Sequence, residues 1–181
     1  ATAGGSLEIF RICEQHKKHD DQCAYIAVSY WKTDIINWII ENDDFDLSSS
    51  DALHNQPLIS FAASTNNIPF VRFLLSKGVS FWDANIEKSD DSSPMEIACQ
   101  WDCLSIVMLM CSTLDTIPTK LFRKCFLVSI EFNSFDILEF YHDNYNSLIT
   151  PDLIKEGREL TETNMLPKMK EALNKLFPID K

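Results

Sequence analysis

The sequence predicts an all-α protein built from helical hairpins that stack side by side as a solenoid. Three observations predict this fold class. Apolar residues form 45% of the 181 residues, enough for a core, whereas the four glycines and seven prolines are too few for a loop-rich β-sandwich. Apolar residues recur at helical spacing in short runs that polar turns interrupt. Similar runs return at intervals of 31 to 36 residues, a period typical of repeat proteins.

The segment 57–78, PLISFAASTNNIPFVRFLLSKG, is the clearest predicted hairpin. Its first short helix has an apolar face at positions i, i+3, i+4 and i+7, formed by Leu58, Phe61, Ala62 and Thr65. Asn66 and Asn67 tolerate the left-handed backbone conformation that a tight reversal requires. Pro69 suits the first turn of a second helix, and Gly78 is expected to end that helix.

Three other segments repeat this pattern, namely 23–42 before it, and 93–111 and 121–141 after it. Each segment has a small residue at the corresponding position of its first helix. These small residues, which are 35, 36 and 31 positions apart, are Ala27, Ala62, Ala98 and Ser129. Two short helices cannot bury their apolar faces alone, so the hairpins must stack, and small residues let neighbouring helices approach closely.

The two ends of the chain differ from the repeats, as expected of segments that cap a stack. Residues 1–6 have the composition of a cloning remnant and are left out of the fold prediction. Residues 7–20 are predicted to form an N-terminal capping helix, and residues 21–147 the repeat array. Residues 148–181 contain two amphipathic helices, which are a C-terminal cap or the start of a further region. Thr150 is expected to cap the first of them.

The segment QPLISFAASTNNIPFVRFLLSKGVSFWD resembles the ankyrin repeat, a helix–turn–helix unit with a period near 33 residues. The residues that match the family pattern are Pro57, Leu58, Ala62, Ala63, Val71, Leu74, Leu75 and Gly78. The segment SPMEIA repeats the opening of the motif with Pro94 and Ala98, although neither copy keeps the threonine of the family. The resemblance extends over residues 21–143 and implies about four divergent repeats with capping helices.

The net charge of −11 argues against several classes of partner. Nucleic acids and anionic membranes attract Lys and Arg, and this chain has 16 of these against 27 Asp and Glu. No apolar run approaches the ~18 residues that a membrane span requires. The six cysteines lie mostly in apolar stretches and no Asn-X-Ser/Thr acceptor occurs, which favours a reducing compartment and an intracellular, cytoplasmic protein.

The sequence predicts no catalytic residue, no cofactor and no metal site. One mixed group of possible zinc ligands is Cys13, His16, His19 and Cys23. Its spacing matches no standard zinc site, so a solvated helix face is the preferred interpretation. Cys99 and Cys103 lack a second pair of ligands and are expected to fill small core positions. Neither a nucleophile motif nor a phosphate-binding glycine loop occurs.

The resemblance implies a protein-binding groove on the concave side of the array. In each repeat, the groove is lined by the second and third residues after the small residue. These positions are Ser29 and Tyr30, Ser64 and Thr65, Gln100 and Trp101, and Glu131 and Phe132. Tyr30, Trp101 and Phe132 would then form an exposed aromatic stripe; the alternative is that these rings turn inward to the core. Phe81 and Trp82, which lie beside the second of the loops between predicted hairpins, complete the candidate binding residues.

The loops expected to form the fingers of the array are acidic. The first carries Glu41, Asp43, Asp44, Asp46 and Asp51. The second carries Asp83, Glu87, Asp90 and Asp91. A basic peptide with apolar anchors would complement an aromatic stripe between such loops. The alternative is that the acidic loops only keep the array soluble.

These observations predict a non-catalytic protein-interaction module, an adaptor or scaffold that is monomeric in isolation and binds another protein or peptide. Two alternatives come from other functional classes. In the first, the chain is a targeting or regulatory segment of a larger enzyme or of a secreted pathogen effector, with catalysis outside these residues. In the second, it is a helical domain stabilised by a metal ion.

Overall fold

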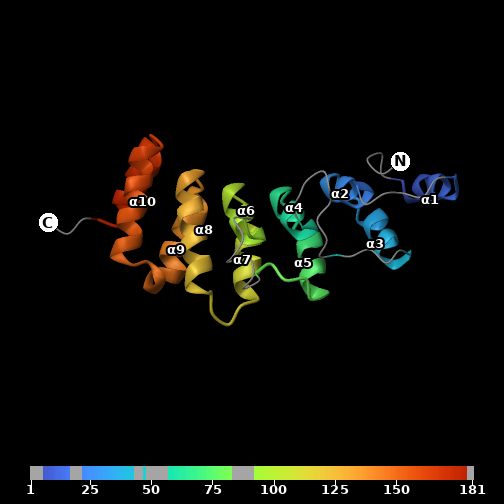
Figure 1. Ribbon diagram of the computed structural model, residues 1–181, viewed down its shortest axis with the longest axis horizontal. Helices are drawn as coiled ribbons and strands as arrows, with labels where there is room; N and C mark the ends of the chain where they lie inside the picture. Colours follow the sequence, from blue (N-terminus) through green and yellow to red (C-terminus); the bar gives the residue numbers. More distant parts are fainter. Residues whose placement is uncertain (1–5, 17–21, 43–46, 48–56, 83–91, 179–181) are drawn as a thin grey trace. The chain divides into compact units, whose positions relative to one another are not determined.

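The computed structural model describes residues 6–16, 22–42, 47, 57–82 and 92–178, and the regular secondary structure in these ranges is helical (Figure 1). The prediction of an all-α repeat architecture is confirmed. The chain divides into two compact units, residues 1–81 and 82–181, which are described separately below. None of the helices in the described ranges is long and apolar enough to span a bilayer.

In its described residues, unit 1 forms one leading helix and two helical hairpins (Figure 1). Its helices are α1 (Leu7–His16), α2 (Gln22–Ser29), α3 (Thr33–Asn42), α4 (Leu58–Ser64) and α5 (Ile68–Ser76). The paired helices α2 and α3, and α4 and α5, pack against each other, and α2 also packs against α4. Ala27 and Ala62 are fully buried, as expected for small residues where neighbouring hairpins meet.

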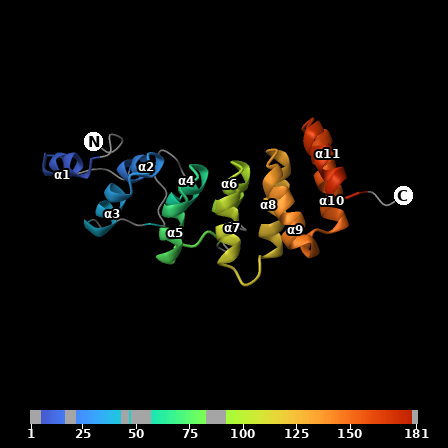
Figure 2. The ribbon, with the colours of Figure 1, turned by 180° about the vertical axis from the view of Figure 1, so that it is seen from behind.

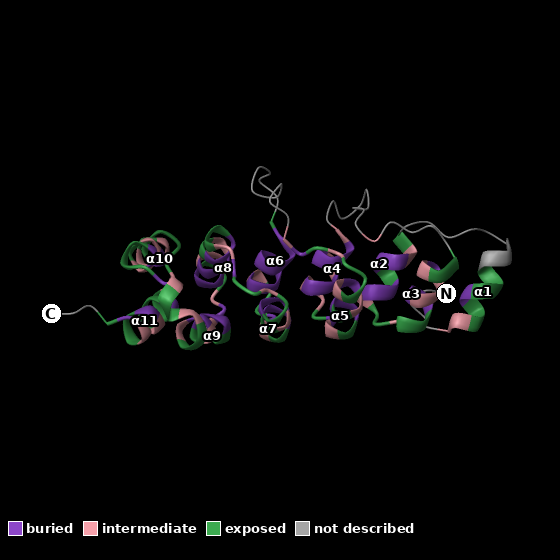
Figure 3. Cartoon of the chain, turned by 90° about the horizontal axis from the view of Figure 1, so that it is seen from below, coloured by how far each residue is buried: buried purple, intermediate pink, exposed green. Residues whose placement is uncertain are grey.

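The described part of unit 2, residues 82 and 92–178, forms three helical hairpins. Its helices are α6 (Pro94–Gln100), α7 (Leu104–Ser112), α8 (Thr119–Glu131), α9 (Phe135–Tyr145), the 3₁₀ turn η2 (Asn146–Leu148), α10 (Pro151–Thr163) and α11 (Pro167–Leu176). Figure 2 shows α10 and α11 paired at the end of this unit. The first helices α6, α8 and α10 form one layer and α7, α9 and α11 form a second layer (Figure 3). Within the first layer, α8 packs against both α6 and α10.

The close approach of α8 and α10 depends on a glycine as well as on small residues. A Cβ atom added to Gly157 would lie 2.6 Å from Cδ1 of Ile130, so a side chain there would force the end of the Ile130 side chain to shift. Ser129 and Thr161 are buried on the same two helices, 32 residues apart. Thr161 therefore occupies, in the fifth hairpin, the place that Ser129 has in the fourth.

All five hairpins turn with the same backbone geometry. The second residue after each first helix has a left-handed conformation, with φ between 53° and 60°; these residues are Trp31, Asn66, Asp102, Asn133 and Met165. The next N–H donates back to the carbonyl of the small residue, as from Lys32 to Ala27 at 2.8 Å and from Leu166 to Thr161 at 2.8 Å. The left-handed residue itself donates to the carbonyl of the following residue of the helix, as from Trp31 to Val28 at 3.1 Å. These two bonds together form the Schellman motif, which satisfies carbonyls at the end of a helix.

The fifth turn extends the hairpin pattern beyond the region in which the sequence motif is recognisable. The sequence indicated only two amphipathic helices after residue 148, as a cap or a further region. In the structure, α10 and α11 form a hairpin with the same left-handed turn at Met165. Thr150 caps α10, because its Oγ1 accepts a hydrogen bond from the N–H of Leu153 at 3.2 Å.

Of the two asparagines that the sequence analysis placed at the reversal, only Asn66 adopts the left-handed conformation. Asn66 has φ 54°, whereas Asn67 has φ −82° and is the N-cap of α5, accepting from the N–H of Phe70. The buried Asn67 side chain also donates from Nδ2 to the carbonyl of Val28, at 3.0 Å, in the preceding hairpin. Ser134, at the equivalent place in unit 2, donates from Oγ to the carbonyl of Cys99 at 2.6 Å. Each side chain thus ties one hairpin to the one before it.

The core of unit 2 contains thiols and a phenol in contact. Cys99, Cys103, Cys111 and Cys125 are all buried, as the sequence predicted for Cys99 and Cys103. The Cys99 sulfur lies 3.3 Å from the hydroxyl oxygen of Tyr141. Burial raises the pKa of Cys111 to about 11 and raises the pKa of Cys125 and of Tyr141 well above their usual values. These groups therefore stay protonated at neutral pH and act as core side chains.

Replacing Met165, a highly exposed residue, by asparagine should raise the free energy of unfolding by about 1 kcal/mol. The left-handed conformation costs most side chains about 1–2 kcal/mol and is tolerated best by glycine and asparagine. Urea unfolding of wild type, Met165→Asn and Met165→Ala measures the gain. The alanine variant removes the same side chain without relieving the backbone, so equal stability of the two variants would contradict the explanation.

The variant Ser134→Ala should lower the free energy of unfolding by about 1–2 kcal/mol, because it loses a buried hydrogen bond between hairpins. The matched control is Ser112→Ala, whose exposed hydroxyl bonds only to Leu109 in its own helix. Its effect should stay within about 0.5 kcal/mol. Equal losses in both variants, measured by urea unfolding, would show that the bond from Ser134 to Cys99 does not stabilise the stack.

Cys13 is exposed and should be the first of the six thiols to react with iodoacetamide at pH 8, since a thiol must be both accessible and ionised to react. Cys99, Cys111 and Cys125 should be labelled only after unfolding in urea. Mass spectrometry of tryptic peptides from folded and unfolded protein reports each site. Rapid labelling of Cys125 in the folded protein would contradict its place in the core.

Candidate functional site

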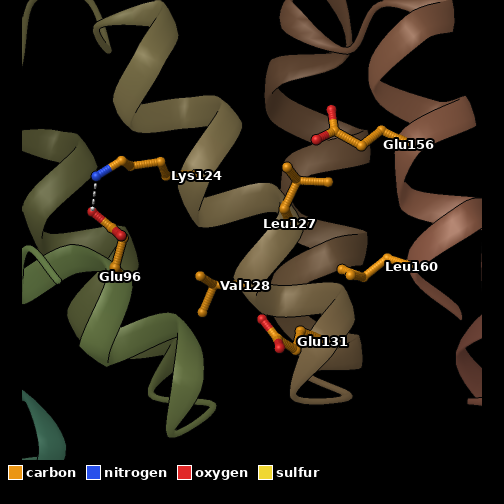
Figure 4. Close-up of a pocket in the computed structure, with 7 residues that line it drawn as sticks. All are labelled: Glu96, Lys124, Leu127, Val128, Glu131, Glu156 and Leu160. Carbon is orange, nitrogen blue, oxygen red and sulfur yellow. Dashed lines mark ion pairs between the residues drawn. The ribbon is translucent and has the colours of Figure 1, made fainter. Parts of the chain in front are cut away.

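A groove crosses the first helices of the three hairpins in unit 2 (Figure 4). It has a volume of ≈ 250 Å³ and is open to one side. Its lining comes from α6, α8 and α10: Glu96, Lys124, Leu127, Val128, Glu131, Glu156 and Leu160. Neighbouring first helices carry these side chains, so the groove exists only because α8 packs between α6 and α10.

The middle of the groove is apolar. Leu127, Val128 and Leu160 line it and are only half-buried in the folded chain. Val128 and Leu160 each directly precede the small buried residue of their helix, so they occupy equivalent positions on α8 and α10. The shared register of the hairpins therefore brings two aliphatic side chains to the same surface.

Charged groups surround this apolar strip. Nζ of Lys124 lies 3.8 Å from Oε1 of Glu96, which is itself held by the capping box with Ser93. Arg123 donates to both carboxylate oxygens of Glu156, at 2.6 and 2.5 Å. Glu131, the last residue of α8, is exposed and forms no ion pair with any residue that the structure describes.

Three of the predicted aromatic rings lie at the surface rather than in the core. Tyr30, Trp101 and Phe132 are 58%, 61% and 47% exposed. Each directly follows the last residue of the first helix in its hairpin, α2, α6 and α8 respectively. In unit 2, Trp101 and Phe132 thus stand at the end of the helices whose sides line the groove. Trp31, next to Tyr30, is exposed as well.

The polar residues predicted at these positions are engaged locally. The hydroxyls of Ser29, Ser64 and Thr65 donate to carbonyls of their own helices, at 2.9, 2.8 and 3.1 Å. All three are half-buried, as is Gln100. Short hydroxyls that bond to the preceding turn are poorly placed to contact a partner, so the aromatic rings and Glu131 are the stronger candidates.

The structure corrects the predicted exposure of Phe81. Its ring is only 5% exposed, so it belongs to the packed interior rather than to an exposed surface beside the finger loop. Moving a phenyl ring out of water lowers the free energy of the folded chain, which favours burial of Phe81 after α5. Trp82 is half-buried. Of the predicted acidic finger residues, only Glu41 is described, and it is exposed; the aspartates and Glu87 lie outside the described residues.

A pair of carboxylates adds negative charge beside Trp101. Partial burial, and secondarily the nearby carboxylate of Asp136, raise the pKa of Asp102. Neither carboxylate takes part in an ion pair within the described ranges. Asp102 lies on the turn that follows α6 and Asp136 lies in the first turn of α9, so these two neighbouring elements carry like charges that a cation would stabilise.

No group of three or more His, Cys, Asp or Glu residues in the described part of the chain could hold a metal ion. Of the four ligands considered from the sequence, Cys13 is exposed and Cys23 is half-buried. His19 and the side chain of His16 lie outside the described residues. Of the buried thiols, that of Cys99 lies against the hydroxyl of Tyr141 and that of Cys103 donates to the carbonyl of Trp101.

Sequence reasoning found the aromatic positions but missed the groove and the fifth hairpin. Leu127 and Leu160 belong to helices whose apolar patterns are interrupted by charge, and the sequence shows no sign that they share a surface. One signal was available: Thr161 lies 32 residues after Ser129, within the range of the other repeats. A small residue at that interval predicts one more hairpin.

No curated protein matches this chain. The family model described as ankyrin repeats (3 copies) matches residues 24–119, more than half of the chain. Ankyrin repeats are generally protein–protein interaction modules and are typically non-catalytic. The match covers α2 to α7, and the hairpins α8–α9 and α10–α11 follow it with the same turn geometry. The chain therefore belongs to the ankyrin-repeat family.

Proposed function

We propose that the chain is a non-catalytic module that binds a partner protein through its first helices, the side that is concave in ankyrin arrays. Tyr30, Trp101 and Phe132 are its anchors. The observation that carries this proposal is that three large aromatic rings occupy the same place in three hairpins and are exposed in each. The fold itself does not need them, since Thr65 fills the equivalent position after α4.

Exposed aromatic rings at one repeated position favour binding over chance. Single apolar residues are common on protein surfaces, whereas aligned rings that contribute nothing to the core are less so. Tyrosine and tryptophan are also the residues that most often dominate the free energy of protein association. The groove on α6, α8 and α10, the helices that Trp101, Phe132 and Asn164 follow, provides a recess for a partner side chain.

The charge of the chain supports a basic partner. Glu131 and the Asp102–Asp136 pair lie close in sequence to the exposed rings of unit 2, and the whole chain carries a net charge of −11. Complementary charge increases the rate of association and excludes partners of the wrong sign. In this proposal the protein acts as an intracellular adaptor or scaffold.

Alanine substitution of Tyr30, Trp101 or Phe132 should weaken partner binding at least about fivefold each, and hardly change the melting temperature. The probe is a protein recovered from lysate by the wild-type chain, then purified and titrated by calorimetry. Met108→Ala is the matched control, because Met108 is an exposed apolar residue on α7, in the other layer. Melting that collapses in the variants, or an equal loss with Met108→Ala, would contradict the proposal.

A further inference from the structure

We infer that the groove between α6, α8 and α10 takes a partner segment in which an apolar side chain stands next to a lysine or arginine. The apolar side chain would contact Leu127, Val128 and Leu160, and the cation would pair with Glu131. This inference rests on the proposed function and specifies the chemistry of the partner.

The size of the groove suits one large side chain. An enclosed cavity of about 150 Å³ in a protein core holds a benzene ring. The groove has a volume of ≈ 250 Å³ and is open, so it has room for a leucine, methionine or phenylalanine side chain together with part of its backbone. It is too small for a globular surface to enter.

The apolar walls favour an apolar occupant. Leu127, Val128 and Leu160 are half-buried and form the centre of the lining, as Figure 4 shows for α8 and α10. Covering these three side chains removes apolar surface from water, which favours binding in proportion to the area covered. A polar group placed there would lose its hydration without gaining a hydrogen-bonding partner from them.

The charge expected of the partner group near Glu131 follows from which charged residues of the groove already have a partner. Lys124 lies near Glu96, and Arg123 holds Glu156, so the cations beside the groove already have carboxylate partners. Glu131 forms no ion pair among the described residues. A neutral partner lying over it would remove water from an uncompensated carboxylate, and an acidic partner would add repulsion, so a cation is the favourable neighbour.

The position of Glu131 strengthens this preference. It is the last residue of α8, where the helix dipole places partial negative charge on the free carbonyls. Phe132 follows it directly, with its ring exposed. The exposed ring of Phe132 therefore adds apolar surface next to the residue that would pair with the cation.

The test uses the full chain and a random dodecapeptide library displayed on phage. Peptides selected on the wild type should be enriched in an apolar residue next to Lys or Arg. Glu131→Lys should weaken binding of such a peptide at least tenfold by fluorescence polarisation. The matched control is Glu159→Lys, an exposed residue of α10 outside the groove lining, where the same charge change should cost no more than about twofold. A second selection on Glu131→Lys should enrich Asp or Glu instead.

The remaining outcomes separate this inference from the proposed function. Peptides that lose affinity with Trp101→Ala and Phe132→Ala, yet bind Glu131→Lys and Glu159→Lys equally, would leave the proposed function standing and overturn the inference. A dimer in sedimentation experiments that Glu131→Lys dissolves would assign the groove to a second copy of the chain, and also overturn it. Failure to enrich any peptide that responds to substitutions on this face would count against both.

Discussion

The close approach of neighbouring first helices is the constraint on which each unit depends. The helices are short, between 7 and 13 residues, and helices of this length are marginal in water by themselves. They persist because each packs against the next hairpin through small, buried positions such as Ala62 in unit 1 and Ala98 in unit 2. Gly157 is another such position, since a Cβ atom there would displace the end of the Ile130 side chain.

Helices that pack this closely also need their backbone polar groups satisfied. The left-handed residue after each first helix directs two N–H groups back to carbonyls of that helix, and the same arrangement occurs five times. Asn67 and Ser134 extend this bonding to the preceding hairpin. Packing and hydrogen bonding therefore fix the same register, which places Val128 and Leu160, and likewise Trp101 and Phe132, at equivalent positions of successive hairpins.

Much of this architecture could be predicted from residue spacing alone. The small residues at Ala27, Ala62, Ala98 and Ser129, and the turn signal at Asn66, are local features with direct structural meaning. The fifth hairpin was harder to recognise, because Thr161 is polar and larger than alanine, and becomes an acceptable core residue only once its hydroxyl bonds to the carbonyl of Arg158.

The candidate site was predictable only in part. The exposed rings follow from a position counted along the repeat, and their exposure agrees with that count. The burial of Phe81 depends on what packs over a segment with no periodic pattern. The groove depends on three helices at once and on which charges pair, such as Arg123 with Glu156. Neither feature is encoded by spacing within a single helix.

The side chain just before the left-handed residue differs from hairpin to hairpin, whereas the backbone conformation of the turn stays the same. Tyr30, Thr65, Trp101, Phe132 and Asn164 all occupy this place, within one chain and on one backbone geometry. Since the turn is held by main-chain bonds, the side chain in front of it can be exchanged with little effect on folding. Ligand preference can therefore diversify one hairpin at a time, while the scaffold that displays it stays the same.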